Sequence, residues 1–357
     1  MSIVLSVDVM GGDHGVNVTI PACINFLKNY PNVQLILVGD RETIYNKIGS
    51  HLSEFSDRID VVHTTEVIEM DELPQLAMRN KKDSSMRVSI NLVKEKKANA
   101  VVSAGNTGAL MAIARYVLRT MPSIERPAIA KILPTMNQDV CMLDLGANVE
   151  CTPEHLLQFG IMGSQLMKAV LQKSSPSIGL LNIGSEDIKG SETIKKASLL
   201  LKKSGLNFYG NVEGDDINKG TVDVVVCDGF TGNVALKTME GMAKMIGYSI
   251  KKELTQNIIT KILSLFAMPA LNKVKQKLNP SKYNGAVLLG LNGLVIKSHG
   301  GADELGFYYA LLQAYHEVNA GVIILLEEYL NKNKQIQEPE ESKKEFREFH
   351  DLSRLWL

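Results

Sequence analysis

Five short loops combine glycine with hydroxyl, amide or carboxylate side chains, and each follows a run of apolar residues. Backbone N–H groups in such loops, together with the positive end of a following helix, can bind an anion. We therefore expect a polar site for a small anion such as phosphate, although a single loop of this kind is also an ordinary tight turn. The candidate ligand-binding residues are Gly11, Gly12, Asp13, Ser103, Gly105, Asn106, Thr107, Gly108, Asn148, Asn182, Asp228 and Thr231.

Cations near these loops are the second chemical feature. Lys189 lies in a short loop between Gly184 and Gly190, an unusual place for a solvated lysine. His299 follows another apolar run, and it can be either a site residue or a structural histidine. The segment RNKKDSS, from Arg79 to Ser85, is a possible second anion site, with a solvated charged surface as the alternative.

Several common chemistries lack their motifs. The sequence has no GxGxxG after the first apolar run, no GxxxxGK[ST], no GxSxG and no HExxH, which disfavours dinucleotide, P-loop, serine-hydrolase and zinc-protease sites. Asp8, Asp144 and Asp228 could together hold a divalent cation, but hydrogen bonding to loop amides is the simpler role, so no metal is expected. The four scattered cysteines are expected to be buried thiols in a reducing compartment.

Charge and hydropathy narrow the class further. The 39 basic and 39 acidic residues balance, so no overall field indicates nucleic-acid binding. The N-terminus does not resemble a signal peptide, and no run reaches the ~18 apolar residues of a spanning helix. We therefore expect a cytoplasmic protein.

The elements that position the loops are short, nearly continuous apolar runs: IVLSVD, VQLILVGD, AVVSAG, VCMLDLGAN, IGLLNIG and VDVVVCDGF. Such runs indicate strands covered on both faces, as in a mainly parallel sheet. Segments with helical spacing, such as Ala22 to Tyr30 and His155 to Leu171, lie between them. The sequence predicts an α/β, doubly wound sheet, in which ligands bind outside the carboxyl ends of the strands.

Two segments depart from this pattern. Lys251 to Lys277 contains six lysines and one glutamate threaded with apolar residues. Pro269 lies in its middle, so we expect a helical hairpin over about 245–279 with its tip near Ala267 to Ala270. A membrane surface, a dimer contact or core packing could each cover its apolar side. The charged segment 331–357 is expected to be a solvated tail beyond one domain spanning 1–330.

Ten motifs in one order give the chain a close resemblance to the PlsX family, from Ile3 to about Tyr329. They are DVMGGD, EMDELP, KKDSSM, SAGNTGALMA, RPAIAKILPT, LDLGANVEC, GLLNIGSEDIKGSE, GNVEG, DGFTGNVALK and VIKSHGGAD. The resemblance implies a fold related to isocitrate dehydrogenase and phosphate acetyltransferase, a homodimer, and peripheral association with the inner face of the cell membrane. Ser185 and Asp215 depart from residue types that are frequent in the family.

The resemblance also implies a reaction, in which a fatty acyl group passes from acyl carrier protein to inorganic phosphate. The product is an acyl phosphate for phospholipid synthesis, with an acylphosphate:glycerol-3-phosphate acyltransferase as downstream partner. No cofactor is expected. Lys189 and Asn233 are the implied catalytic residues. Arg79, Lys81, Lys82 and Arg87 are candidates for binding the acidic carrier protein, and Ile258, Ile259, Ile262, Leu265 and Phe266 for binding the membrane.

The residues are compatible with direct attack of phosphate on a thioester, because phosphate is already largely dianionic and a thiol is a good leaving group. Three alternatives remain open. They are a short-chain phosphate acyltransferase that uses coenzyme A, a nicotinamide-dependent dehydrogenase on the related fold, and a lipid-state sensor without catalysis.

Overall fold

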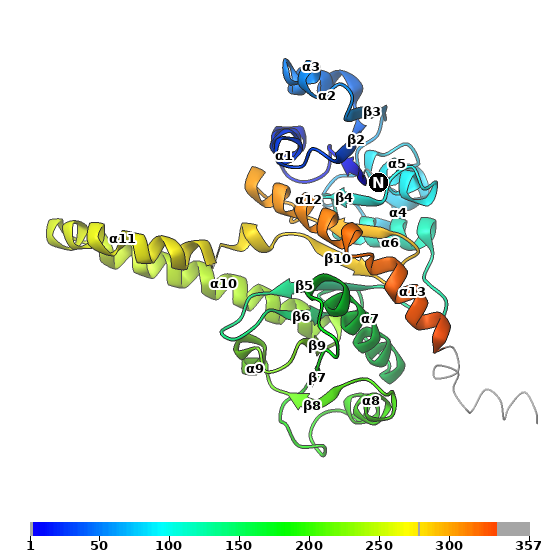
Figure 1. Cartoon of the computed structure of the whole chain (residues 1–357), viewed down its shortest axis with the longest axis vertical. Coiled ribbons are helices and arrows are strands. Elements are labelled where there is room, and N and C mark those ends of the chain that lie inside the picture. Colours follow the sequence, from blue (N-terminus) through cyan, green and yellow to red (C-terminus); the bar gives the residue numbers. More distant parts are fainter. Residues whose placement is uncertain (1–2, 278, 334–357) are drawn as a thin grey trace, which may run out of the picture.

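A single mixed sheet forms the centre of the molecule (Figure 1). The computed structural model describes residues 3–277 and 279–333, and some side chains between 258 and 280 lie outside that description. In these residues the strands lie side by side in the order β3-β2-β1-β4-β11-β10-β5-β6-β9-β7-β8. Their bounds are β1 Ile3–Asp8, β2 Val33–Gly39, β3 Ile59–His63, β4 Ala100–Ser103, β5 Ala128–Leu133, β6 Val140–Leu143, β7 Ile178–Leu181, β8 Phe208–Val212, β9 Val224–Val226, β10 Ala286–Leu289 and β11 Leu294–Lys297.

The six apolar runs singled out in the sequence are strands β1, β2, β4, β6, β7 and β9. They lack alternation because helices cover both faces of the sheet. One face packs against α1, α7, α12 and α13, and the other against α4, α5, α6 and the first turns of α10. The helices are α1 Val16–Asn29, α2 Arg41–Ile48, α3 His51–Glu54, α4 Pro74–Asn80, α5 Ser85–Lys94, α6 Thr107–Leu118, α7 Pro153–Leu171, α8 Glu192–Lys203, α9 Gly214–Lys219, α10 Gly229–Leu254, α11 Ile258–Lys277, α12 Glu304–Asn319 and α13 Val322–Lys332, with a 3-10 turn at Pro280–Tyr283.

Strand direction divides the sheet into two blocks. Strands β3, β2, β1, β4 and β11 are mutually parallel, and so are β6, β9, β7 and β8. Between the blocks, β10 and β5 make three consecutive antiparallel pairings, so the second block runs opposite to the first. The sheet is therefore mostly parallel, as predicted. Its carboxyl-end loops, however, leave from two opposite edges rather than one.

Helices α10 and α11 form an arm that projects from the sheet (Figure 1). The predicted tip near Ala267 to Ala270 is wrong, because Pro269 lies inside α11 and the chain turns between α10 and α11. Thr255 ends α10 by donating its hydroxyl to the Lys251 carbonyl at 2.8 Å. Asn257 begins α11 by accepting the Thr260 amide at 2.8 Å. These caps satisfy the helix ends that meet at the turn, whereas Pro269 removes only one hydrogen bond. Across the described residues, no helix is both long and apolar enough to span a bilayer.

Candidate active site

A row of polar side chains crosses the sheet where β1, β4 and β11 end. The register pairs Asp8 with Ser103, and Ser103 with Lys297. The residues just before them, such as Val7 and Ile296, belong to the core on the opposite face of the sheet. Because side chains alternate along a strand, the polar row faces α5, α6 and α10. All three polar residues are buried, so the row forms the floor of a site rather than an open surface.

Asp8 organises the loops around this floor. Its carboxylate accepts the hydroxyls of Ser85 and Ser103, both at 2.6 Å. Burial raises the pKa of Asp8, and the hydrogen bonds from Ser103, Ser85 and the Gly11 amide oppose that shift. A side chain at Gly11 would place its Cβ 2.5 Å from the Asp8 carboxylate. Glycine at this position therefore lets the first loop approach the buried acid.

Lys297 joins the β11 loop to the β4 loop. Its ammonium donates to the carbonyl of Ala104 at 3.3 Å and to the carbonyl of Ser298. Burial lowers the pKa of Lys297 to about 8, and the negative charges of Asp8 and Asp13 act in the opposite direction. The charge is thus held by backbone dipoles and nearby carboxylates beneath the SAGNTG loop.

Helix α10 provides a wall beside the floor. Lys237 pairs with Glu240 at 2.9 Å, and Asn233 lies one turn before Lys237 on the same face. Lys131 on β5 lies on the same face of the sheet as the polar row of the floor. Burial lowers the pKa of Lys131. The negative charge of Glu240 opposes this shift, and the positive charge of Lys237 adds to it. Burial is also the main cause of the lowered pKa of His299, and Lys237 is the second cause.

Three lysines and a histidine therefore share one region with Glu240 and the buried Asp8. Asp13 also acts on Lys297, so the lysines and carboxylates of this region nearly balance, and the lysine ammonium groups are its candidate partners for a dianion. Lys131 and Lys237 were not among the candidate residues expected from the sequence. The helical spacing of Asn233, Lys237 and Glu240 could have predicted that these residues share one face of α10. The position of Lys131 could not be predicted in this way, because it depends on strand pairing.

The second set of loops positions Asn233. Asp144 follows β6, and its carboxylate accepts the amides of Ile129, Ala147 and Asn148 at 2.7–3.0 Å. Burial raises its pKa, and these hydrogen bonds oppose the shift. Helix α10 starts directly against this loop, since a Cβ at Gly232 would overlap the Asp144 carbonyl oxygen. Close packing at glycine thus fixes where Asn233 emerges.

Lys189 is exposed on the loop that follows β7, the strand next to β9. Asn182 holds that loop, because its amide group donates to the Lys189 carbonyl at 3.2 Å and its oxygen accepts the Ile183 amide at 2.8 Å. Asn233 is also exposed, at the start of the helix that follows β9. The structure therefore places Lys189 on a loop and Asn233 in the first turns of α10 at the same edge of the sheet, with both residues exposed.

Several predicted ligand residues are occupied within the protein. The Asn106 side chain caps α6 through the Ala109 amide at 3.0 Å and donates to the carbonyls of Met70 and Glu72. Asn148 donates to Pro127 and Asp144, and the Asp228 carboxylate accepts both the amide and the hydroxyl of Thr231. These four side chains shape the loops. Among the other predicted ligand residues, Asp13 and Thr107 are exposed. Gly12 lies too close to Ala104, and Gly108 too close to Pro74, for either position to hold a side chain.

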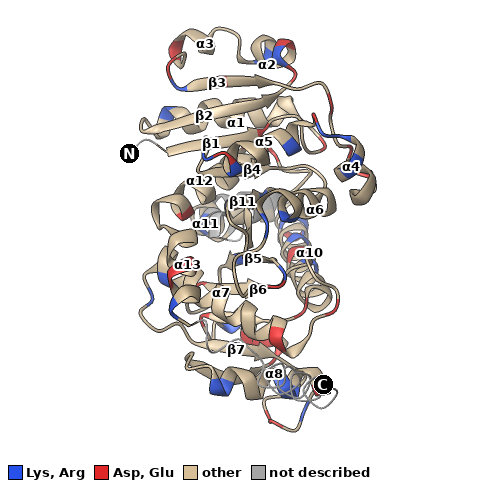
Figure 2. Ribbon diagram, turned by 90° about the vertical axis from the view of Figure 1, so that its right-hand side faces the viewer, with Lys and Arg blue, Asp and Glu red and all other residues tan. Residues whose placement is uncertain are grey.

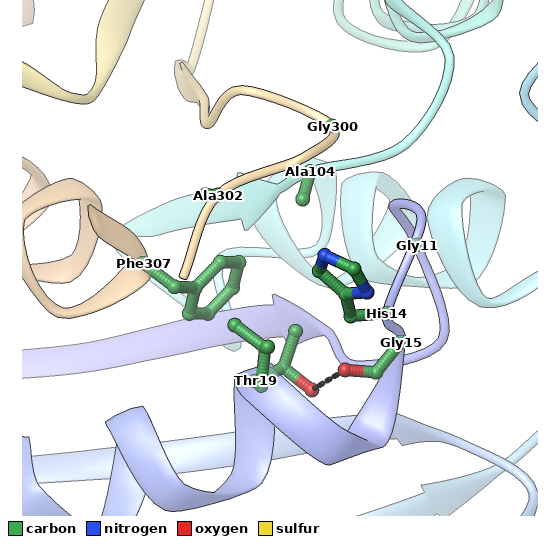
Figure 3. Close-up of a pocket in the computed structure, with 9 residues that line it drawn as sticks. Gly11, His14, Gly15, Thr19, Ala104, Gly300, Ala302 and Phe307 are labelled. Atoms are coloured by element: carbon green, nitrogen blue, oxygen red, sulfur yellow. Dashed lines mark hydrogen bonds between the residues drawn. The ribbon is translucent and has the colours of Figure 1, made fainter. Parts of the chain in front are cut away.

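A narrow pocket lies beside the first loop (Figure 3). His14 points toward it across from Phe307, and Thr19 closes its base with a hydrogen bond to the Gly15 carbonyl at 3.2 Å. Ala104 and Gly300 also line it. The pocket encloses about 170 Å³ including space open to solvent. It adds an apolar recess to an otherwise polar region.

The cysteines are free thiols. Cys23, Cys141 and Cys227 are buried, as predicted, and Cys151 is half-buried. Burial raises the pKa of Cys227 well above its usual value, and the charge of Asp144 adds to that shift. Cys227 is therefore a neutral thiol, which is a poor nucleophile. In the part of the chain that the structure describes, no group of three or more His, Cys, Asp or Glu could hold a metal ion.

The fold has counterparts among solved structures. Phosphotransacetylases share it: the enzyme from Streptococcus pyogenes matches with a TM-score of 0.59 and 15% identity, over 89% of this chain and 94% of that one. The enzyme from Staphylococcus aureus matches with a TM-score of 0.57 and 16% identity, over 90% of this chain and 94% of that one. At such identities the likeness concerns the fold alone.

Sequence comparison then gives the family. The family described as "Fatty acid synthesis protein" matches residues 3–325. The phosphate acyltransferase of Chromobacterium violaceum is 59% identical over 90% of this chain and 94% of its own length. That of Legionella pneumophila strain Paris is 53% identical over 92% of this chain and 97% of its own. The chain belongs to the PlsX family of phosphate acyltransferases.

Proposed function

We propose that the protein transfers a long-chain fatty acyl group from acyl carrier protein to inorganic phosphate, producing an acyl phosphate for phospholipid synthesis. The observation that carries this proposal is the cationic region between the sheet floor and α10. There Lys237, one turn beyond Asn233 on α10, lies close enough to Lys131 and Lys297 to affect the pKa of both. A phosphate dianion and a developing oxyanion both suit such a region.

The proposed step forms one bond and breaks one. A phosphate oxygen attacks the thioester carbonyl carbon, and the tetrahedral intermediate then expels the carrier thiolate, which takes a proton from solvent. Asn233 and loop amides donate to the carbonyl oxygen as it gains charge. Lys189 holds phosphate or neutralises the developing charge. No acyl-enzyme is required, in keeping with the neutral thiol of Cys227.

The test is acyl phosphate formation from palmitoyl carrier protein and phosphate by native protein, Lys189→Ala and Asn233→Ala. We expect activity in the native protein and a loss of at least about 100-fold in each variant, the usual effect of removing one oxyanion donor. Lys196→Ala and Asn218→Ala change exposed residues elsewhere and serve as controls. Formation of acetyl phosphate from acetyl-coenzyme A, with none from the long-chain donor, would instead identify a short-chain enzyme.

We also propose that the protein is a homodimer and that its helical arm binds the inner membrane surface. Phe266 is 83% exposed and Met245 is 54% exposed, and Lys251 and Lys252 are exposed on the same arm. Exposed apolar side chains with lysines suit anionic lipid. The side chains of Ile258, Ile259, Ile262 and Leu265 lie outside the described residues. An acyl phosphate made there would reach the proposed acylphosphate:glycerol-3-phosphate acyltransferase without crossing the cytoplasm.

Vesicle sedimentation tests the membrane proposal. Native protein should sediment with phosphatidylglycerol vesicles and less with phosphatidylcholine vesicles. Phe266→Ser should weaken sedimentation, whereas Tyr209→Ser, which changes an equally bulky exposed side chain on β8, should not. Equal sedimentation of the two variants would assign no membrane role to the arm. Light scattering at several protein concentrations would test the dimer.

A further inference from the structure

An arginine pair flanks one exposed tyrosine on the surface of α5 and α6. The guanidinium carbon of Arg87 lies 4.9 Å from the centre of the Tyr116 ring, and that of Arg119 lies 5.6 Å from it. Tyr116 is 52% exposed. Cation–π contact of this kind favours positions of both guanidinium groups over the ring and leaves their donors available.

Neither guanidinium has a carboxylate partner within the described residues, where every recorded ion pair involves other groups. Lys81, by contrast, is paired with Glu72 at 2.7 Å and also donates to the Val67 carbonyl. Its charge is satisfied internally. Of the cations predicted to meet a carrier protein, Lys81 is thus poorly suited, whereas Arg87 is well placed.

Helices α5 and α6 connect this surface to the candidate site. Helix α5 starts at Ser85, whose hydroxyl bonds to Asp8, and Arg87 lies two residues further along. Helix α6 starts at the SAGNTG loop, is 12 residues or ~18 Å long, and carries Tyr116 near its far end. The two helices pack together on one face of the sheet (Figure 2). A partner on this surface would sit about one helix length from the site, within reach of an extended thioester arm.

We propose that Arg87, Tyr116 and Arg119 form the docking surface for an acidic acyl carrier protein. The proposal rests on the proposed function, since it names where that donor binds. Two planar guanidinium groups beside an aromatic ring are suited to bind a helix that presents carboxylates and an apolar side chain.

The experiment compares two donors of the same acyl group, palmitoyl carrier protein and palmitoyl-coenzyme A, in native protein and in Arg87→Ala/Arg119→Ala. We expect kcat/KM for the carrier protein to fall at least tenfold in the double variant, and kcat/KM for palmitoyl-coenzyme A to change less than twofold. Native activity with the carrier protein should also fall with added salt more steeply than that of the variant. Arg41→Ala, which removes an exposed arginine of α2, is the control and should behave as native.

Tyr116→Phe should keep most carrier-protein activity, because the ring remains, whereas Tyr116→Ala should lose it. An equal fall with both donors would overturn the docking proposal, since the arginines would then act on the site itself. No change with either donor would overturn it as well. If native protein forms no acyl phosphate from either donor, the proposed function itself fails. This outcome differs from those that would overturn only the docking proposal.

Discussion

Lys237 and Glu240 form an ion pair of 2.9 Å on the face of α10 that also carries Asn233. The pair holds the Lys237 ammonium beside the polar floor of the sheet, close enough to affect the pKa of Lys131, Lys297 and His299. Helix α10 therefore presents both the Asn233 amide and the Lys237 ammonium. It runs from the edge where the second block of strands ends toward the edge where the first block ends.

Lys237→Ala is expected to raise the KM for phosphate about tenfold or more, because it removes one cation from a dianion site. Lys237→Arg should retain much of the activity, since it keeps the charge. Steady-state kinetics with varied phosphate is the measurement. Lys252→Ala, on the projecting part of the same helix, is the control. An unchanged KM for phosphate in Lys237→Ala would place the phosphate elsewhere.

Gly232→Ala should disturb the start of α10. The new Cβ would overlap the Asp144 carbonyl oxygen, so the helix must shift at a cost of about 1–3 kcal/mol, as for other overpacked sites. Both the free energy of unfolding and acyl transfer should decrease. Gly241→Ala, on the same helix with no neighbour within 4 Å, should instead raise stability by about 0.5–1 kcal/mol. Denaturant unfolding of the two variants makes the comparison, and similar effects of both changes would contradict it.

Lys297 should give the enzyme a basic pH limit. Its folded-state pKa of about 8 means that the ammonium is present below this pH and lost above it. The link between Ala104 and the β11 loop would weaken as the charge disappears. We expect kcat/KM to decline above about pH 8 in native protein, and the decline to move to higher pH in Lys297→Arg. A pH–rate profile with identical basic limits for both proteins would exclude Lys297 as the titrating group.

Glu317 should make stability depend on pH. It is fully buried on α12, with Gln313 donating to it at 2.6 Å, and burial raises its pKa to about 8. The folded protein therefore binds this proton more tightly than the unfolded chain does. Stability is highest below the unfolded pKa and is lost as the pH rises from about 4.5 through 8, with a slope of up to about 1.4 kcal/mol per pH unit.

Glu317→Gln removes this titration, so its stability relative to native protein should rise between pH 5 and pH 8. Thermal unfolding across that range is the measurement. Glu304→Gln changes an exposed carboxylate at the start of the same helix and should run parallel to native protein. Parallel curves for Glu317→Gln as well would show that Glu317 is ionised in the folded state.

The sequence alone determined six strands of the central sheet and the polar loops that follow five of them. Continuous apolar runs predicted β1, β2, β4, β6, β7 and β9, because a strand buried on both faces needs no polar residues. Glycine-bearing loops marked the strand ends, and ten ordered motifs identified the family. These signals are local, so they are readable without knowing which segments meet.

Only the tertiary structure decided which segments meet. The reversal at β10 and β5 sends the loops to two edges, and it depends on long-range strand pairing that no local pattern encodes. That register places Lys131 and Lys297 on one face, and the path of α10 brings Lys237 beside them. The capping side chains at 255–257, rather than Pro269, decided where the arm turns. The contact of Arg87 with Tyr116 joins α5 to α6 and depends on how these helices pack, whereas Arg119 lies only three residues from Tyr116.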